Sequence, residues 1–120
     1  MRSSVHEQEL EVEATAARVT EDSLIVELED GRTISSPLQW YPRLFHAKKK
    51  DRNKIELSGY GLHWPELDED LSVRGIILGR KSGESPESFK FWLDHYKAGR
   101  KVTLEDFMRS KRLVRRKKSA

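Results

Sequence analysis

Hydrophobic and polar residues alternate most regularly in the first third of the chain. Residues 23–28 place three apolar side chains on one side, which predicts a half-buried β-strand. Residues 14–20 alternate less regularly, and residues 33–36 form a short run that ends at a proline. Asp30 followed by Gly31 is typical of a tight hairpin turn, because glycine adopts positive φ without steric cost. We therefore predict an antiparallel β-meander of three strands.

The pattern becomes helical after this meander. Apolar residues recur at intervals of three and four, at Leu38, Tyr41, Leu44 and Phe45. This spacing predicts a helix, with Pro42 acceptable only near its start. The charged residues 48–54 are predicted to continue the helical region as a solvent-exposed stretch.

Further short strands and a short helix are expected in the middle of the chain. Residues 55–57 and 60–64 return to an extended pattern that is interrupted by glycines. The apolar run at 71–78 predicts a helix, with Asp70 or Ser72 as its N-cap. The acidic residues just before this run are expected to favour its N-terminus through the helix dipole.

Two helices are predicted in the last third. Ser85, Pro86 and Glu87 suit the N-cap and first two positions of a helix that ends near Gly99, with an aromatic face formed by Phe89, Trp92 and Tyr96. Thr103 and Asp106 start a second helix, which carries an apolar face before a basic run. The fold class is therefore α+β: a meander, a helix, further strands and C-terminal helices.

Charge divides the chain unevenly, although the net charge of the 120 residues is only +3. Residues 1–13 have a net charge of −3, residues 14–94 a net of −2 and residues 95–120 a net of +8. We interpret residues 1–13 as an acidic leader, 14–93 as a small domain and 94–120 as a helical basic extension. Seven cations lie within ten positions of that extension: Arg109, Lys111, Arg112, Arg115, Arg116, Lys117 and Lys118.

Three interpretations of this basic extension stay open. It could contact nucleic-acid phosphates, dock on an acidic protein partner, or be a disordered solubilising tail. Leu113 and Val114 interrupt the charges and would give a helix a small apolar stripe. We take nucleic-acid contact by the seven cations as the functional prediction for this segment.

Composition removes several classes of protein. The chain has no cysteine, which excludes disulfides, thiolate metal sites and a thiol nucleophile. The sequence shows no apolar run near the roughly 18–20 residues that cross a bilayer, and residues 1–13 lack an apolar signal segment. We therefore expect a cytoplasmic protein without membrane contact. We also expect no cofactor, because the glycines fit neither a phosphate loop nor a dinucleotide fingerprint.

The sequence resembles the small bacterial family catalogued as domain of unknown function 2442. The resemblance spans about residues 14–93 and rests on EDSLIVELEDG at 21–31, TISSPLQWY at 33–41, PRLFHA at 42–47, GYGLHWPELDEDLSVRGIILG at 59–79 and GRKSGESPESFKFWL at 79–93. It implies a compact α+β fold of about 80 residues without an established activity. It also implies, as a partner, a neighbouring small protein of the class called domain of unknown function 4160.

One candidate site lies in the His63, Trp64, Pro65 motif. With Asp68 or Asp70, the His63 imidazole could bind a divalent cation or move a proton. The alternative is structural, with Pro65 fixing a turn and Trp64 packing in the core. We favour the structural interpretation and predict no catalytic residue and no metal ligand.

A second candidate site is a partner-binding surface or pocket. Trp40, Tyr41 and His46 could form it together with His63 and Trp64, although core packing would explain the same aromatic residues. We predict a non-enzymatic interaction module, and the resemblance to the family implies that it is antitoxin-like or regulatory in type. The alternatives are a small metal- or ligand-dependent enzyme that uses His63, helped by His46, and a structural subunit of a larger assembly.

Overall fold

The computed structural model describes residues 10–119, of which the side chains of Leu104 and residues 113–119 are outside the description. The chain forms two units that divide between Ser82 and Gly83. Residue 93, where we predict the small domain to end, lies inside helix α5 (Pro86–Lys97). Phe91 of α5 packs on Phe107 of the following helix, which groups α5 with the C-terminal unit.

The first unit begins with the predicted meander, which is confirmed. Strands β1 (Ala14–Val19), β2 (Ser23–Leu28) and β3 (Thr33–Pro37) form an antiparallel sheet in the order β1-β2-β3. Its hairpin closes where the Leu28 N–H donates to the Arg32 carbonyl at 2.8 Å, and Gly31 has a φ of 94°. The alternating pattern of β2 places its leucines and Val26 in the core.

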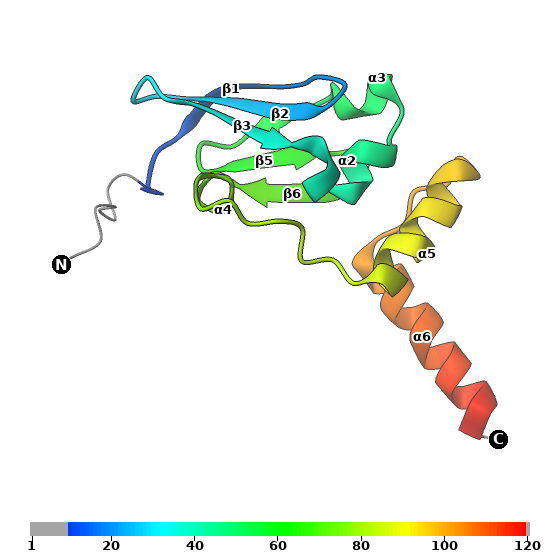
Figure 1. Cartoon of the computed structure of the whole chain (residues 1–120). Coiled ribbons are helices and arrows are strands. Elements are labelled where there is room, and N and C mark those ends of the chain that lie inside the picture. The colour runs from blue at the N-terminus through cyan, green and yellow to red at the C-terminus, as the bar shows by residue number, and fades with distance from the viewer. Residues whose placement is uncertain (1–9, 120) are drawn as a thin grey trace. The chain divides into compact units, whose positions relative to one another are not determined.

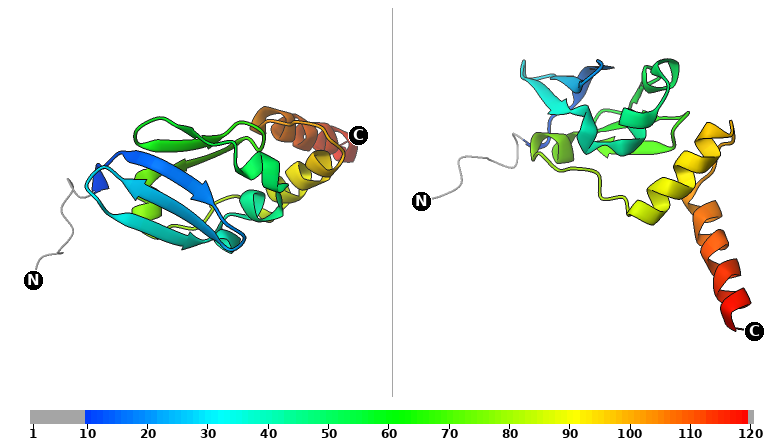
Figure 2. Two further views of the ribbon diagram at one scale, coloured as in Figure 1. Left: turned by 90° about the horizontal axis from the view of Figure 1, so that it is seen from above. Right: turned by 45° about the vertical axis from the view of Figure 1, so that its right-hand side comes forward.

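A second antiparallel sheet has the order β4-β5-β6. It comprises β4 (Glu56–Leu57), β5 (Gly61–Trp64) and β6 (Glu69–Ser72). Figures 1 and 2 show that this sheet lies beneath the β1-β2-β3 sheet as a second layer. Side chains from both sheets fill the core, where Trp64 of β5 is 0% exposed.

The prediction of a helix over 71–78 is wrong at its start. Leu71 and Ser72 belong to β6, where Leu71 pairs with Leu62, and the helix α4 is Val73–Ile77. Ser72 is the N-cap, since its hydroxyl accepts a hydrogen bond from the Gly75 N–H at 2.9 Å. The preceding acidic residues therefore lie in a turn and a strand, and they do not form the first turn of the helix.

The helical region predicted after Pro37 is present in three short pieces. These are the 3-10 helix η1 (Leu38–Trp40), α2 (Pro42–His46) and α3 (Lys49–Arg52). Tyr41 separates η1 from α2. Its φ is −125° and its ψ is 85°, because a residue before proline is disfavoured in the α region. Tyr41 is 1% exposed and belongs to the core, whereas the Phe45 side chain is 43% exposed.

The second unit contains α5 and α6 (Leu104–Ser119), and the sequence predicts both helices. Ser85 caps α5 by accepting a hydrogen bond from the Ser88 N–H at 3.1 Å. The rings of Phe91 on α5 and Phe107 on α6 lie 5.4 Å apart and join the two helices. Within the part of the chain that the structure describes, no helix is long and apolar enough to cross a membrane.

Candidate functional site

Helix α6 carries all seven cations that the sequence singles out for phosphate contact. They are Arg109, Lys111, Arg112, Arg115, Arg116, Lys117 and Lys118, and the helical backbone runs through every one of these positions. No aspartate or glutamate follows Asp106 in the sequence. The positive charge therefore accumulates along a single element toward its C-terminal end, where a helix dipole favours cations.

The first cations of this helix have acidic neighbours. Arg109 lies 3.7 Å from Glu105 and 3.9 Å from Asp106, while Lys111 lies 3.4 Å from Glu87 on α5. The Lys111 ammonium also lies over the Phe107 ring, 5.3 Å from its centre. These pairs are solvent-exposed and contribute little to stability, so a polyanion can replace them as partners. The side chains of the last four cations lie outside the described residues.

The start of α6 is fixed by a reciprocal pair of hydrogen bonds. The Thr103 N–H donates to Asp106 Oδ2 at 2.9 Å, and the Asp106 N–H donates to Thr103 Oγ1 at 3.2 Å. The hydrogen bond from the Thr103 backbone holds the pKa of Asp106 below its usual value, with smaller contributions from the Thr103 hydroxyl and Arg109. The sequence predicts this capping box because it involves only local residues.

His63 and Asp70 form a cross-strand pair on the second sheet. His63 Nδ1 lies 2.7 Å from Asp70 Oδ1, and the two residues are register partners on β5 and β6. Asp68 is not part of this pair; it is exposed in the turn before β6, and its carbonyl accepts a hydrogen bond from Arg43. Among the described residues, no group of three or more histidine or acidic side chains is arranged to hold a metal ion. The contact of His63 with Asp70 thus has the form of a strand-pairing interaction.

The residues predicted for a partner surface do not form one site. Tyr41 and Trp64 are in the core, with exposures of 1% and 0%, so they support the fold. Trp40 is half-buried beneath the Lys81 ammonium, and His46 is exposed with its ring 5.3 Å from that of Phe45. His63 is engaged by Asp70. The surface residues of this set therefore belong to different elements with different neighbours.

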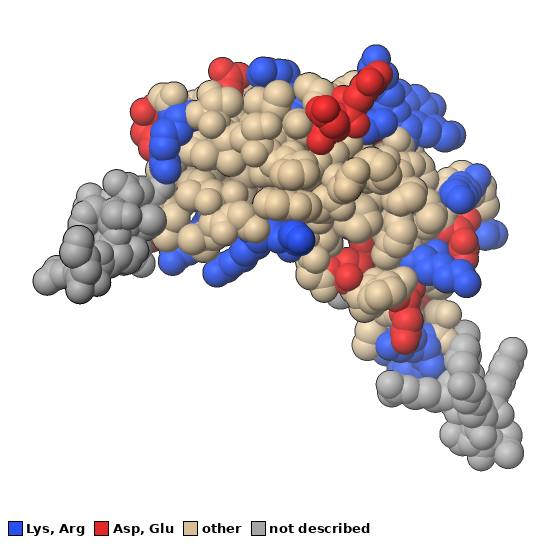
Figure 3. All heavy atoms as spheres, viewed as in Figure 1, with Lys and Arg blue, Asp and Glu red and all other residues tan. Residues whose placement is uncertain are grey.

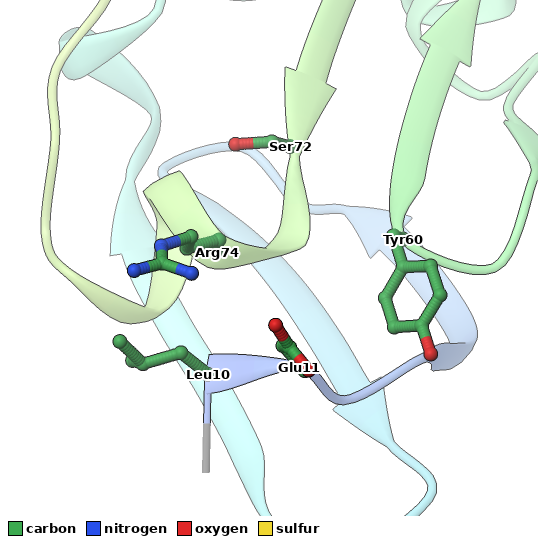
Figure 4. Close-up of a pocket in the computed structure, with 5 residues that line it drawn as sticks. All are labelled: Leu10, Glu11, Tyr60, Ser72 and Arg74. Carbon is green, nitrogen blue, oxygen red and sulfur yellow. The ribbon is translucent and has the colours of Figure 1, made fainter. Parts of the chain in front are cut away.

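Sequence reasoning missed a pocket around Tyr60, which Figure 4 shows. It has a volume of about 420 Å³ and is lined by Leu10, Glu11, Tyr60, Ser72 and Arg74. Tyr60 is 58% exposed in the turn before β5, and Ser72 is already used as the cap of α4. The sequence feature that could have indicated this pocket is Tyr60 itself, an aromatic residue between Gly59 and Gly61.

Comparison with known proteins places the first unit in a family. The family model described as Protein of unknown function (DUF2442) matches residues 14–82, which end where the first unit ends. A crystal structure of a protein of unknown function from Rhodospirillum rubrum is 35% identical and has a TM-score of 0.55, with the similarity covering 62% of this chain and 94% of that one. Among curated proteins, none matches the chain. Because the family match spans more than half of the sequence, this chain belongs to the DUF2442 family.

Proposed function

We propose that this protein is a non-enzymatic interaction module, antitoxin-like or regulatory in type. Its α+β unit binds a second small protein, and its helix α6 binds the phosphate backbone of nucleic acid. The observation that carries the proposal is the single helix that holds seven cations after the last acidic residue of the chain. Such local charge supplies sequence-independent affinity, because each phosphate contact releases condensed counterions.

The dimensions of α6 support contact with several phosphates at once. From Arg109 to Lys118 the helix rises about 14 Å, at about 1.5 Å per residue. Duplex DNA carries one charge per about 1.7 Å of its axis, so a segment of this length faces several phosphates. The packing of Phe107 on Phe91 gives the helix a fixed base on α5, which lowers the ordering cost of binding.

Neutralising the end of α6 is expected to weaken binding of a short DNA duplex strongly. In the variant, Arg115, Arg116, Lys117 and Lys118 are replaced by glutamine. At 50 mM salt we expect an affinity loss of about a hundredfold or more, because four phosphate contacts are removed. Fluorescence anisotropy of a labelled duplex measures the change, and a chain that ends at Met108 gives the complete loss of the segment.

The matched control removes the same charge from other positions of the second unit. Lys90, Lys97, Arg100 and Lys101 are replaced by glutamine, which lowers the net charge by the same four units. We expect this control to retain affinity within about threefold to fivefold, since only general attraction is reduced. Binding by the shortened chain that equals that of the full chain would remove the nucleic-acid part of the proposal.

The protein-binding part is tested by purifying the chain from its native cells. The exposed ring of Tyr60, three residues after the exposed Leu57 of β4, is the kind of side chain that anchors protein contacts. We expect a small protein to copurify in a fixed ratio and to be lost with Tyr60→Ala. Phe45→Ala, which removes another exposed aromatic ring, is expected to retain it. Isolation of the wild-type chain as a free monomer would contradict this part.

A further inference from the structure

A second concentration of positive charge lies on the first unit. We call it the α3 cluster: Lys48, Lys49, Lys50, Arg52 and Lys54, which are five of the seven residues 48–54. The sequence pattern alone indicates only a solvent-exposed face. The net charge of −2 over residues 14–94 gives no sign of this basic segment. In Figure 3, lysine and arginine side chains gather around α3 at the upper right of the molecule.

The one acidic residue of the cluster is buried, whereas its lysines are exposed. Asp51 is 8% exposed and is directed into the unit, while Lys49 and Lys50 are exposed. The turn that achieves this is short: the N–H groups of Asp51 and Arg52 both donate to the Lys48 carbonyl, at 3.0 and 3.1 Å. The exposed side chains of the cluster are therefore positively charged, while its one carboxylate is buried.

The backbone at the end of α3 is held against the core. The indole N–H of the buried Trp64 donates to the Arg52 carbonyl at 3.0 Å, which fixes the end of α3. The Lys54 ammonium lies 3.6 Å from Glu66, in the turn after Trp64. A fixed backbone loses less conformational freedom on binding than a mobile one, so contacts from its side chains contribute more affinity.

A hollow beside the cluster supplies a place for an anionic group. It has a volume of about 370 Å³ and is lined by Val19, Thr20, Glu21, Lys49 and Arg52. Arg52 Nε is buried and, among the described residues, has no hydrogen-bond partner. An unsatisfied guanidinium donor is costly to bury, so a turn of the Arg52 side chain toward an anion in the hollow would be favoured. Glu21 also lines the hollow, so with Lys49 and Arg52 the lining has a net charge of +1.

We propose that the α3 cluster is a second contact site for the phosphate backbone of nucleic acid. The proposal rests on the proposed function, because it assigns a further surface for the ligand that α6 binds. Residues 48–54 contain no apolar side chain, so attraction to a lipid surface would rest on charge alone, without insertion between lipids. The cluster thus fits a polyphosphate chain in water better than a lipid surface.

The test replaces Lys49 and Lys50 with glutamine in the full chain and follows duplex binding by anisotropy between 50 and 200 mM salt. Each lost contact lowers the slope of log affinity against log salt by about 0.9, so we expect a slope less steep by about 1.8. The matched control, Arg32→Gln with Arg80→Gln, removes the same charge at exposed or half-exposed positions outside the cluster, and we expect its slope to change by less than about 0.5. Circular dichroism verifies that both variants stay folded.

The outcomes separate this proposal from the proposed function. If the cluster variant has the wild-type slope while neutralised α6 does not, the cluster proposal fails and the α6 proposal stands. If only the cluster variant changes the slope, the α6 proposal fails and the cluster proposal stands. A last experiment measures binding to vesicles of equal parts phosphatidylcholine and phosphatidylserine. If replacing Lys49 and Lys50 weakens vesicle binding but leaves duplex binding unchanged, the nucleic-acid assignment is overturned.

Discussion

Trp64→Ala is expected to leave most of the first unit unfolded in mild denaturant. The side chain is 0% exposed, and truncation of a buried tryptophan costs about 3–5 kcal/mol through lost burial and the cavity that remains. Small domains have a total stability of about 5–15 kcal/mol, so this loss removes much of the margin. Urea unfolding followed by circular dichroism measures the free-energy difference.

Two further variants separate packing from hydrogen bonding at this position. Trp64→Phe keeps an aromatic ring but removes the donor to the Arg52 carbonyl, and we expect a loss of about 1–3 kcal/mol. Trp40→Ala, which truncates a half-buried indole in the same unit, is expected to cost less than Trp64→Ala. A loss below about 1 kcal/mol for Trp64→Ala would contradict the assignment of Trp64 to the centre of the core.

The features predicted correctly depend on neighbours in sequence. The hairpin follows from Asp30 and Gly31, and the start of α6 follows from Thr103 and Asp106, three residues apart. In each case the required hydrogen bonds form within a few residues of one another. Local pattern is therefore sufficient for the meander, for both C-terminal helices and for the family resemblance, which lies within continuous segments.

The features missed depend on contacts between distant segments. An apolar run that includes Leu71 suits a helix, and only its pairing with Leu62 makes it a strand. The basic residues of the α3 cluster are visible in the sequence, but the burial of Asp51 and the hollow beside Arg52 arise from tertiary packing. For the same reason, aromatic residues expected at one surface divide between core and exterior.

Raising the salt concentration from 50 to 200 mM is expected to weaken duplex binding by the full chain about 10⁴-fold. Seven phosphate contacts by α6 give a log–log slope of about −6, and the α3 cluster steepens it further. Anisotropy titrations at four salt concentrations determine the slope. The chain that ends at Met108 lacks all seven α6 cations, so its remaining slope reports the α3 cluster.

A competitor distinguishes nucleic acid from the other ligands that a basic helix attracts. Polyglutamate carries dense negative charge without phosphates, and a helix built for an acidic protein would bind it as tightly as it binds the duplex. We expect the affinity for the duplex to exceed that for polyglutamate by at least about tenfold at equal charge, because phosphate oxygens accept charge-assisted hydrogen bonds from arginine in a bidentate geometry.

In the salt titration, a log–log slope shallower than about −2 would mean that α6 makes at most two phosphate contacts, as a solubilising tail would.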